Sequence, residues 1–140
     1  MSDILLVGLK PKSDEGKEFF LHSSDDWMEI LEVICALTDY IFPVEEYMYR
    51  DSWLAQPTPH LDGYGAFILS LQIERILKEG TAAEHLELYY RSVPLLIDYF
   101  EGDEEHMAEN VKERLEQLDE LAVFLKLSGG CRAKWSHEEA

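Results

Sequence analysis

The sequence predicts a mainly helical protein, an antiparallel bundle of about four helices that forms one domain over residues 1–140. Three observations favour this fold class. Apolar residues recur at intervals of three and four along four separate segments. Short joints with glycine and capping residues at 80 and 102 predict antiparallel neighbours, and the connection at 43–61 is the exception. Hydrophobic residues make up 46% of the 140 residues, enough for one core without disulfides or metals.

The first part of the chain indicates extended structure. Short apolar runs at 4–9 and 18–21 flank a polar stretch at 10–17, a pattern typical of two strands and a loop. Because an isolated two-stranded hairpin is only marginally stable, the pair needs a covering helix or a third strand. The tail around 131–135 is a candidate for a short closing strand, so the N- and C-terminal segments could form a small β element together.

The first helix follows the serines and acids of segment 22–26, which suit the unpaired backbone amides and the dipole of a helix start. Its apolar residues form one helical stripe, and Phe42-Pro43 ends it. The stripe consists of Trp27, Ile30, Leu31, Ile34, Leu37 and Ile41.

The second helix starts near Asp62 and stops before Gly80. It is apolar on most sides, so it should lie centrally in the core. Gly80 suits the position just after a helix C-terminus, and segment 81–84 (Thr-Ala-Ala-Glu) reads as a capping box that opens the third helix. Pro94 lies inside the third helix and should kink or split it before Phe100.

The fourth helix follows Gly102 and Asp103 and runs to about Ser128, where Gly129-Gly130 stops it. Its apolar residues repeat at steps of four and three, which makes a narrow seam with a broad polar back. This pattern predicts an outer helix of the bundle. The seam consists of Val111, Leu115, Leu118, Ala122 and Leu125.

The connection at 43–61 is long for a joint in a small domain, and such connections are usually functional or disordered. Its aromatic residues argue against disorder. Tyrosine, tryptophan and arginine carry much of the binding energy at protein interfaces, although these rings could instead fold back onto the end of the bundle. Residues around the start of the second helix belong to the same candidate surface. The candidate partner-binding residues are Tyr47, Tyr49, Arg50, Trp53, His60, Asp62 and Tyr64.

Acidic residues dominate the charge. The chain carries 12 basic and 29 acidic residues, a formal net charge of −17. Ten acids lie between Asp98 and Glu120 against Lys112 and Arg114, a net charge of −8 in 23 residues. Such a segment is either a solvated face or a surface that steers a basic partner. The total exceeds the ~2–8 charges that solubility requires of a small domain, which adds weight to a partner. The candidate acidic patch is Asp103, Glu104, Glu105, Glu109, Glu113 and Glu116.

Several function classes find no support in the sequence. Nucleic-acid binding and docking on anionic lipid need clustered Lys and Arg. The longest charge-free apolar stretch, 63–73, is too short for a bilayer span, and the N-terminal run lacks the features of a signal peptide, so we expect a cytoplasmic protein. Nucleophile-elbow, phosphate-loop and dinucleotide motifs do not occur. Two distant cysteines and unpaired histidines predict neither a metal nor a cofactor.

Two stretches resemble a set of small bacterial proteins of unknown function. They are Asp62-Gly63-Tyr64-Gly65, which opens an apolar helix, and segment 124–131 (FLKLSGGC), which leads to Trp135. The resemblance carries no known activity, substrate or cofactor. It implies only a bacterial, cytoplasmic and non-secreted protein.

The acidic patch and the aromatic segment lead to three hypotheses about function. The first is a non-enzymatic interaction module, more narrowly an immunity- or inhibitor-type protein that masks a basic partner such as a nuclease toxin. The second is a small-molecule- or metal-binding protein or enzyme with a pocket around His60, Asp62 and Tyr64. The third is a homo-oligomer that buries the loop aromatics against a second copy. We favour the first, because both features suit a protein partner.

Overall fold

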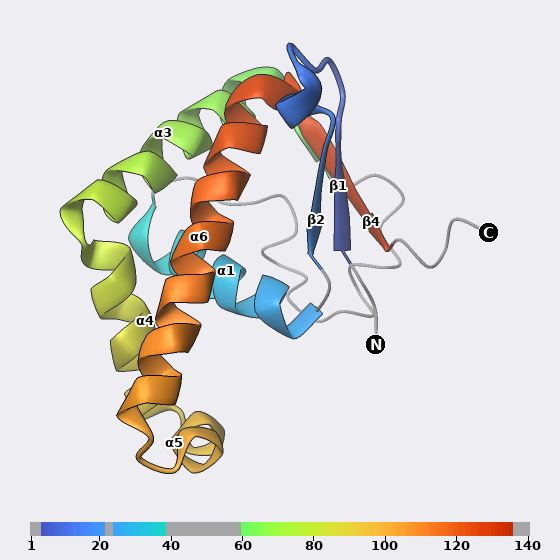
Figure 1. The fold of residues 1–140 in the computed structure, drawn as a ribbon. Coiled ribbons are helices and arrows are strands. Elements are labelled where there is room, and N and C mark those ends of the chain that lie inside the picture. Colours follow the sequence, from blue (N-terminus) through green and yellow to red (C-terminus); the bar gives the residue numbers. More distant parts are fainter. Residues whose placement is uncertain (1–3, 22–23, 39–59, 136–140) are drawn as a thin grey trace.

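The computed structural model describes residues 4–21, 24–38 and 60–135. In these ranges the protein is mainly helical with a four-stranded antiparallel sheet (Figure 1), so the predicted fold class is confirmed. The helices are α1 (Ser24–Leu37), α3 (Gly63–Glu79), α4 (Thr81–Ser92), α5 (Pro94–Phe100) and α6 (Glu104–Ser128). The strands are β1 (Ile4–Gly8), β2 (Glu18–Leu21), β3 (His60–Leu61) and β4 (Cys131–Trp135), with the short 3-10 helix η1 (Asp14–Gly16) before β2.

The sheet joins segments from both ends of the chain, in the strand order β2-β1-β4-β3. β1 pairs with β2 through Leu6 opposite Phe19, and with β4 through Gly8 opposite Cys131. The predicted closing strand is thus β4, which pairs with β1 and adds a further strand to the hairpin of β1 and β2. Phe19 is buried and its ring lies 6.1 Å from that of Phe124, so α6 covers this face of the sheet. β3 was not predicted, because two residues are too few to show an alternating pattern.

The helices pack around α6. Figure 1 shows α3 and α6 side by side and antiparallel, while α4 and α5 return the chain to the N-terminal end of α6. The predicted stripe of α1 is confirmed where it is described, since Trp27, Ile30, Leu31 and Ile34 are at most 1% exposed. The helix ends at Leu37, before the predicted end, and Ile41 lies outside the described residues.

The joint between α3 and α4 confirms the predicted stop at Gly80 but not the capping box after it, and the next joint confirms the predicted split. Gly80, with a φ of 81°, both ends α3 and precedes α4. Thr81 is therefore already helical, and its hydroxyl donates to the carbonyl of Ile76 at 3.3 Å. The predicted capping box is wrong for this reason. Pro94 begins α5 as its first residue, so the expected split occurs at Val93.

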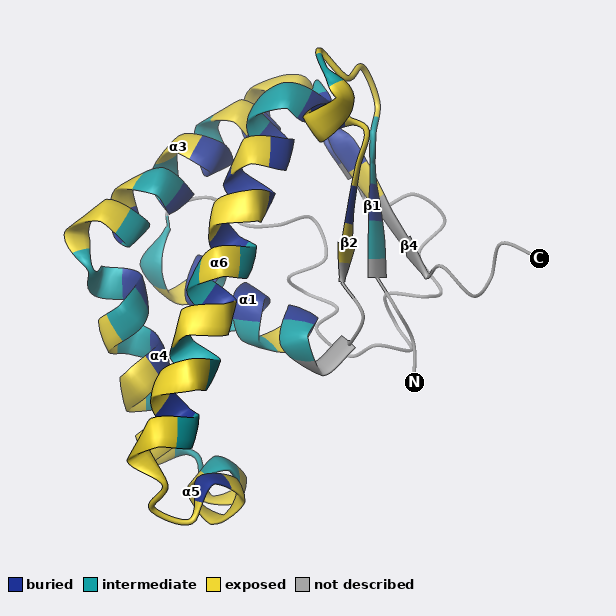
Figure 2. Cartoon of the chain, in the orientation of Figure 1, coloured by how far each residue is buried: buried dark blue, intermediate teal, exposed yellow. Residues whose placement is uncertain are grey.

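The positions of α3 and α6 also correct the sequence analysis. α3 is not surrounded by the core: it packs on α4 and α6 with one face, whereas Tyr64, Phe67 and Leu71 are 41–77% exposed. α6 is not an outer helix, since it contacts all four other described helices and the sheet. Its buried surface widens toward the C-terminus through Leu121 and Phe124, which lie outside the predicted seam. Figure 2 shows exposed residues along the other side of α6 and over α5.

Candidate functional site

The structure describes only some of the candidate partner-binding residues. Tyr47, Tyr49, Arg50 and Trp53 lie outside the described residues. His60 starts β3 opposite Arg132. Tyr64, in the first turn of α3, is 77% exposed. The structure therefore places His60, Asp62 and Tyr64 in one short segment at the start of α3. A binding role for the candidate partner-binding residues stays a prediction.

The two glycine-containing stretches meet at one backbone junction. Asp62 caps α3, because its carboxylate accepts a hydrogen bond from the amide of Gly65 at 2.7 Å. A Cβ atom on Gly130 would lie 2.8 Å from the carbonyl oxygen of Leu61, so the turn after α6 can approach β3 this closely only with glycine. Both stretches thus hold the end of α6 against the start of α3. The carboxylate of Asp62 has a structural role, because it caps α3.

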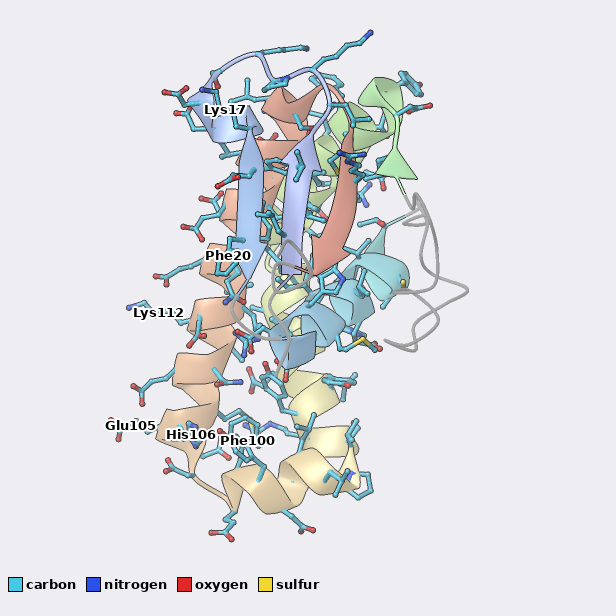
Figure 3. All side chains as sticks on the ribbon, turned by 90° about the vertical axis from the view of Figure 1, so that its right-hand side faces the viewer. Lys17, Phe20, Phe100, Glu105, His106 and Lys112 are labelled. Carbon is cyan, nitrogen blue, oxygen red and sulfur yellow. The ribbon has the colours of Figure 1, made fainter. Side chains whose placement is uncertain are left out.

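The acids between Asp98 and Glu120 are all exposed. Five of those on α6 follow one another at steps of four, four, three and four residues, which places them on one side of the helix. Figure 3 shows Glu105 and Lys112 projecting from the same side of α6, away from the other helices. We name this set the acidic face; it consists of Glu105, Glu109, Glu113, Glu116 and Glu120.

Two members of the predicted acidic patch serve the fold instead. Asp103 caps α6 by accepting a hydrogen bond from the amide of His106 at 3.0 Å. Glu104 accepts two hydrogen bonds from the guanidinium of Arg91, at 2.5 and 3.0 Å, and this hydrogen bonding lowers the pKa of Glu104. The acidic face therefore retains four of the six predicted residues and adds Glu120.

Arg114 is buried, and the one member of the acidic face with which it pairs is Glu113, at 3.2 Å. It lies on α6 but is only 5% exposed. Its guanidinium donates to Asp26 at 2.8 Å and to Glu29 at 2.9 Å, both on α1. Burial opposes the charged form, but the two carboxylates outweigh it and raise the pKa of Arg114. Within segment 98–120, which is fully described, Lys112 is therefore the only exposed base.

The buried charges belong to a hydrogen-bond network that joins α1, α4 and α6. The hydroxyl of Tyr90 donates to Glu29 at 2.5 Å and accepts from the amide of Asn110 at 3.3 Å. Gln117 donates to Asp26 at 3.2 Å and accepts from Arg114. Sequence reasoning missed this network. Its one sequence signal is that Arg114 lies four residues before Leu118, hence on the buried side of the helix.

A cavity of about 530 Å³ lies beside this network. It is lined by residues of α1, α4, α5 and α6, and we name its polar lining residues the floor and its apolar and aromatic lining residues the wall. The floor consists of Asp26, Glu29, Asn110 and Arg114. The wall consists of Met28, Tyr89, Val93, Leu95, Leu96 and Tyr99. None of these wall residues was predicted as part of a site, because each fits an ordinary apolar stripe.

Alkaline pH should destabilise the protein through two buried groups. Burial, followed by the hydrogen bond to Glu29, raises the pKa of Tyr90, and burial raises the pKa of Cys131 to about 12. Unfolded, these groups release protons near their ordinary pKa values of about 10 and 8.5. Stability is therefore complete below about pH 8.5 and falls by up to about 1.4 kcal/mol per pH unit for each group above its ordinary pKa.

Urea denaturation at pH 8 to 11 measures this slope. Cys131→Ala should make the loss between these pH values smaller, since the alanine has no proton to release. An unchanged slope in that variant would mean that the thiol ionises without unfolding.

Metal binding and membrane insertion find no support in the described residues. No group of three or more His, Cys, Asp and Glu side chains is arranged to hold a metal ion in the described ranges. None of the helices there combines the length and apolar character that a membrane span requires. The comparisons with known proteins add no relative: no protein-family model, no curated protein and no solved structure matches this chain.

Proposed function

We propose that this protein is a non-enzymatic interaction module that binds a basic partner protein through the acidic face of α6. The observation that supports this most is the burial of Arg114, which leaves Lys112 as the only exposed base in segment 98–120. Ten acids are exposed there, and the described arginines pair only with Glu104 and Glu113 among them. A surface of one charge sign raises the rate of association with an oppositely charged partner by about 10- to 1,000-fold. The narrower form is an immunity- or inhibitor-type protein of the bacterial cytoplasm that masks a basic toxin.

An apolar surface lies next to the acidic face and would complete such an interface. On α5, Leu95 is 80% exposed, Tyr99 61% and Ile97 46%. The ring of Tyr99 lies 5.2 Å from that of His106, so this surface adjoins the N-terminal end of α6. Apolar and aromatic residues surrounded by charge are the usual composition of a protein interface. A second copy is not the proposed partner, because two acidic faces repel each other.

Charge substitutions on the acidic face test the proposal. The chain is used as bait in a lysate of its own cells, and the captured protein is then purified for binding measurements. A triple variant with Glu105→Gln, Glu109→Gln and Glu116→Gln should bind it about tenfold more weakly or worse, because each exposed pair contributes a fraction of the binding free energy. The affinity of the unaltered chain should fall as salt rises.

A matched control changes the same amount of charge elsewhere. Glu18, Glu79 and Glu84 are exposed residues outside the acidic face, and their replacement by glutamine also removes three negative charges. This control should bind as the unaltered chain does. Equal losses in both triple variants, an acidic captured protein or an affinity that is flat across salt concentrations would each contradict the proposal.

A further inference from the structure

The cavity between α1, α4, α5 and α6 has the size of a ligand site. Its volume of about 530 Å³ lies within the range of about 300–1,000 Å³ that small-molecule pockets occupy. Leu95 and Tyr99 form part of its wall and are largely exposed, so a ligand can reach it from solvent. An apolar wall above a few polar groups is the usual arrangement of such pockets.

The hydrogen bonds of the floor determine which charge a ligand would carry. Arg114 already donates four hydrogen bonds, to Asp26, Glu29, Glu113 and Gln117, out of the five N–H groups of a guanidinium. It therefore has little capacity left for an anion. Both carboxylate oxygens of Asp26 accept hydrogen bonds as well.

Glu29 is the floor residue that can still accept a hydrogen bond from a ligand. Its Oε1 accepts from both Tyr90 and Arg114, whereas its Oε2 accepts no hydrogen bond from the described residues. One guanidinium faces the two carboxylates of Glu29 and Asp26, so the floor carries an excess negative charge. The side chain of Glu29 is only 16% exposed, so a charge-assisted hydrogen bond from a cationic ligand to this oxygen would form in a poorly solvated place.

We propose that this cavity binds an ammonium or guanidinium group carried on a hydrocarbon stem. The cation is received by Oε2 of Glu29, and the stem lies along the apolar wall. The rings of Tyr89 and Tyr99 belong to that wall and add the attraction of aromatic faces for cations. None of its floor residues belongs to the acidic face, whereas Leu95 and Tyr99 of its wall also belong to the apolar surface next to that face.

The test uses hexylamine, 1-hexanol and hexanoate as probes of equal length with different charge. Each is titrated into the full chain at constant ionic strength, and NMR follows the methyl signals of Met28 and Leu95, which line the cavity. Hexylamine should shift these signals saturably, 1-hexanol should bind at least tenfold more weakly, and hexanoate should not bind. Equal binding of the alcohol, or amine shifts confined to the acidic face, would overturn the proposal.

Substitutions at the rim and at the floor complete the test. Leu95→Ala and Tyr99→Ala should each weaken hexylamine binding at least threefold. Leu88→Ala is the matched control, because Leu88 is also exposed, at 63%, but does not line the cavity. Glu29→Gln should abolish the preference for the amine over the alcohol. If that variant does not fold, the comparison of the three probes still decides the matter.

Two sources could supply this chemistry, a free alkylamine or a Lys or Arg side chain of a protein. A fourth titration, with lysine blocked at both its amino and carboxyl ends, separates them. A free-amine site prefers hexylamine, whereas a side-chain site binds both equally.

Discussion

Replacing Arg114 by methionine should lower the free energy of unfolding by about 3–5 kcal/mol. Methionine keeps most of the buried volume but removes the charge that faces Asp26 and Glu29 at 2.8 and 2.9 Å. The side chains of these two carboxylates are only 20% and 16% exposed, so without the guanidinium they stay ionised in a poorly solvated site or take up protons. Urea denaturation followed by circular dichroism at neutral pH measures the loss.

Arg91 provides the control for this prediction. It also contacts two carboxylates, Glu87 and Glu104, but its side chain is 44% exposed. Water replaces the lost contacts at an exposed site, so Arg91→Met should leave the urea midpoint nearly unchanged. Adding Asp26→Asn and Glu29→Gln to Arg114→Met should recover part of the stability. Equal effects of Arg91→Met and Arg114→Met would contradict a buried ionic network.

Gly16→Ala should cost about 3 kcal/mol or more, because the added methyl group has no space. A Cβ atom at Gly16 would lie closer than 3.0 Å to the backbone carbonyl of Leu127, near the end of α6. That carbonyl accepts a hydrogen bond from the amide of Lys12 at 2.8 Å, so moving it away breaks a second contact. The loop after β1 must therefore separate from α6, which thermal unfolding will register as a large fall in the midpoint.

Gly102→Ala separates this steric effect from backbone strain. Gly102 has a φ of 78°, and no atom lies within 4 Å of the place that a Cβ atom would take. Alanine there should cost about 1–2 kcal/mol, which is the strain of the left-handed conformation alone. If the Gly16 variant were no less stable than the Gly102 variant, the close approach of η1 to α6 would be wrong.

The spacing of apolar residues and the glycine, proline and capping residues at the element ends were sufficient to predict most of the helices and strands. The helical period of Trp27, Ile30 and Ile34 identified buried residues of α1, and Pro94 located the split between α4 and α5. These features are local, so neighbouring residues determine them. Gly80 ends α3 as predicted, but the capping box at 81–84 was wrong because this one glycine both ends α3 and precedes α4, which the pattern of a single helix does not reveal.

The candidate site depends on contacts between distant segments and was predicted less well. The net charge of segment 98–120 was correct as a count, but the count treated Arg114 as a surface residue. Its partners Asp26 and Glu29 lie on α1, and no local pattern connects them to α6. The cavity was missed for the same reason. Tyr47 and Trp53 lie outside the described ranges, so their role in partner binding remains a prediction.

The central position of β1 in the sheet has a consequence for how the chain folds during synthesis. β1 (Ile4–Gly8) leaves the ribosome long before its second neighbour, β4 (Cys131–Trp135). A two-stranded hairpin is marginal by itself, so β1 and β2 must wait until the described helices and β4 have been synthesised. Joining such distant segments requires the closure of a very long loop, which slows the final step. We therefore expect the helices to assemble first and the sheet to close only after β4 has been synthesised.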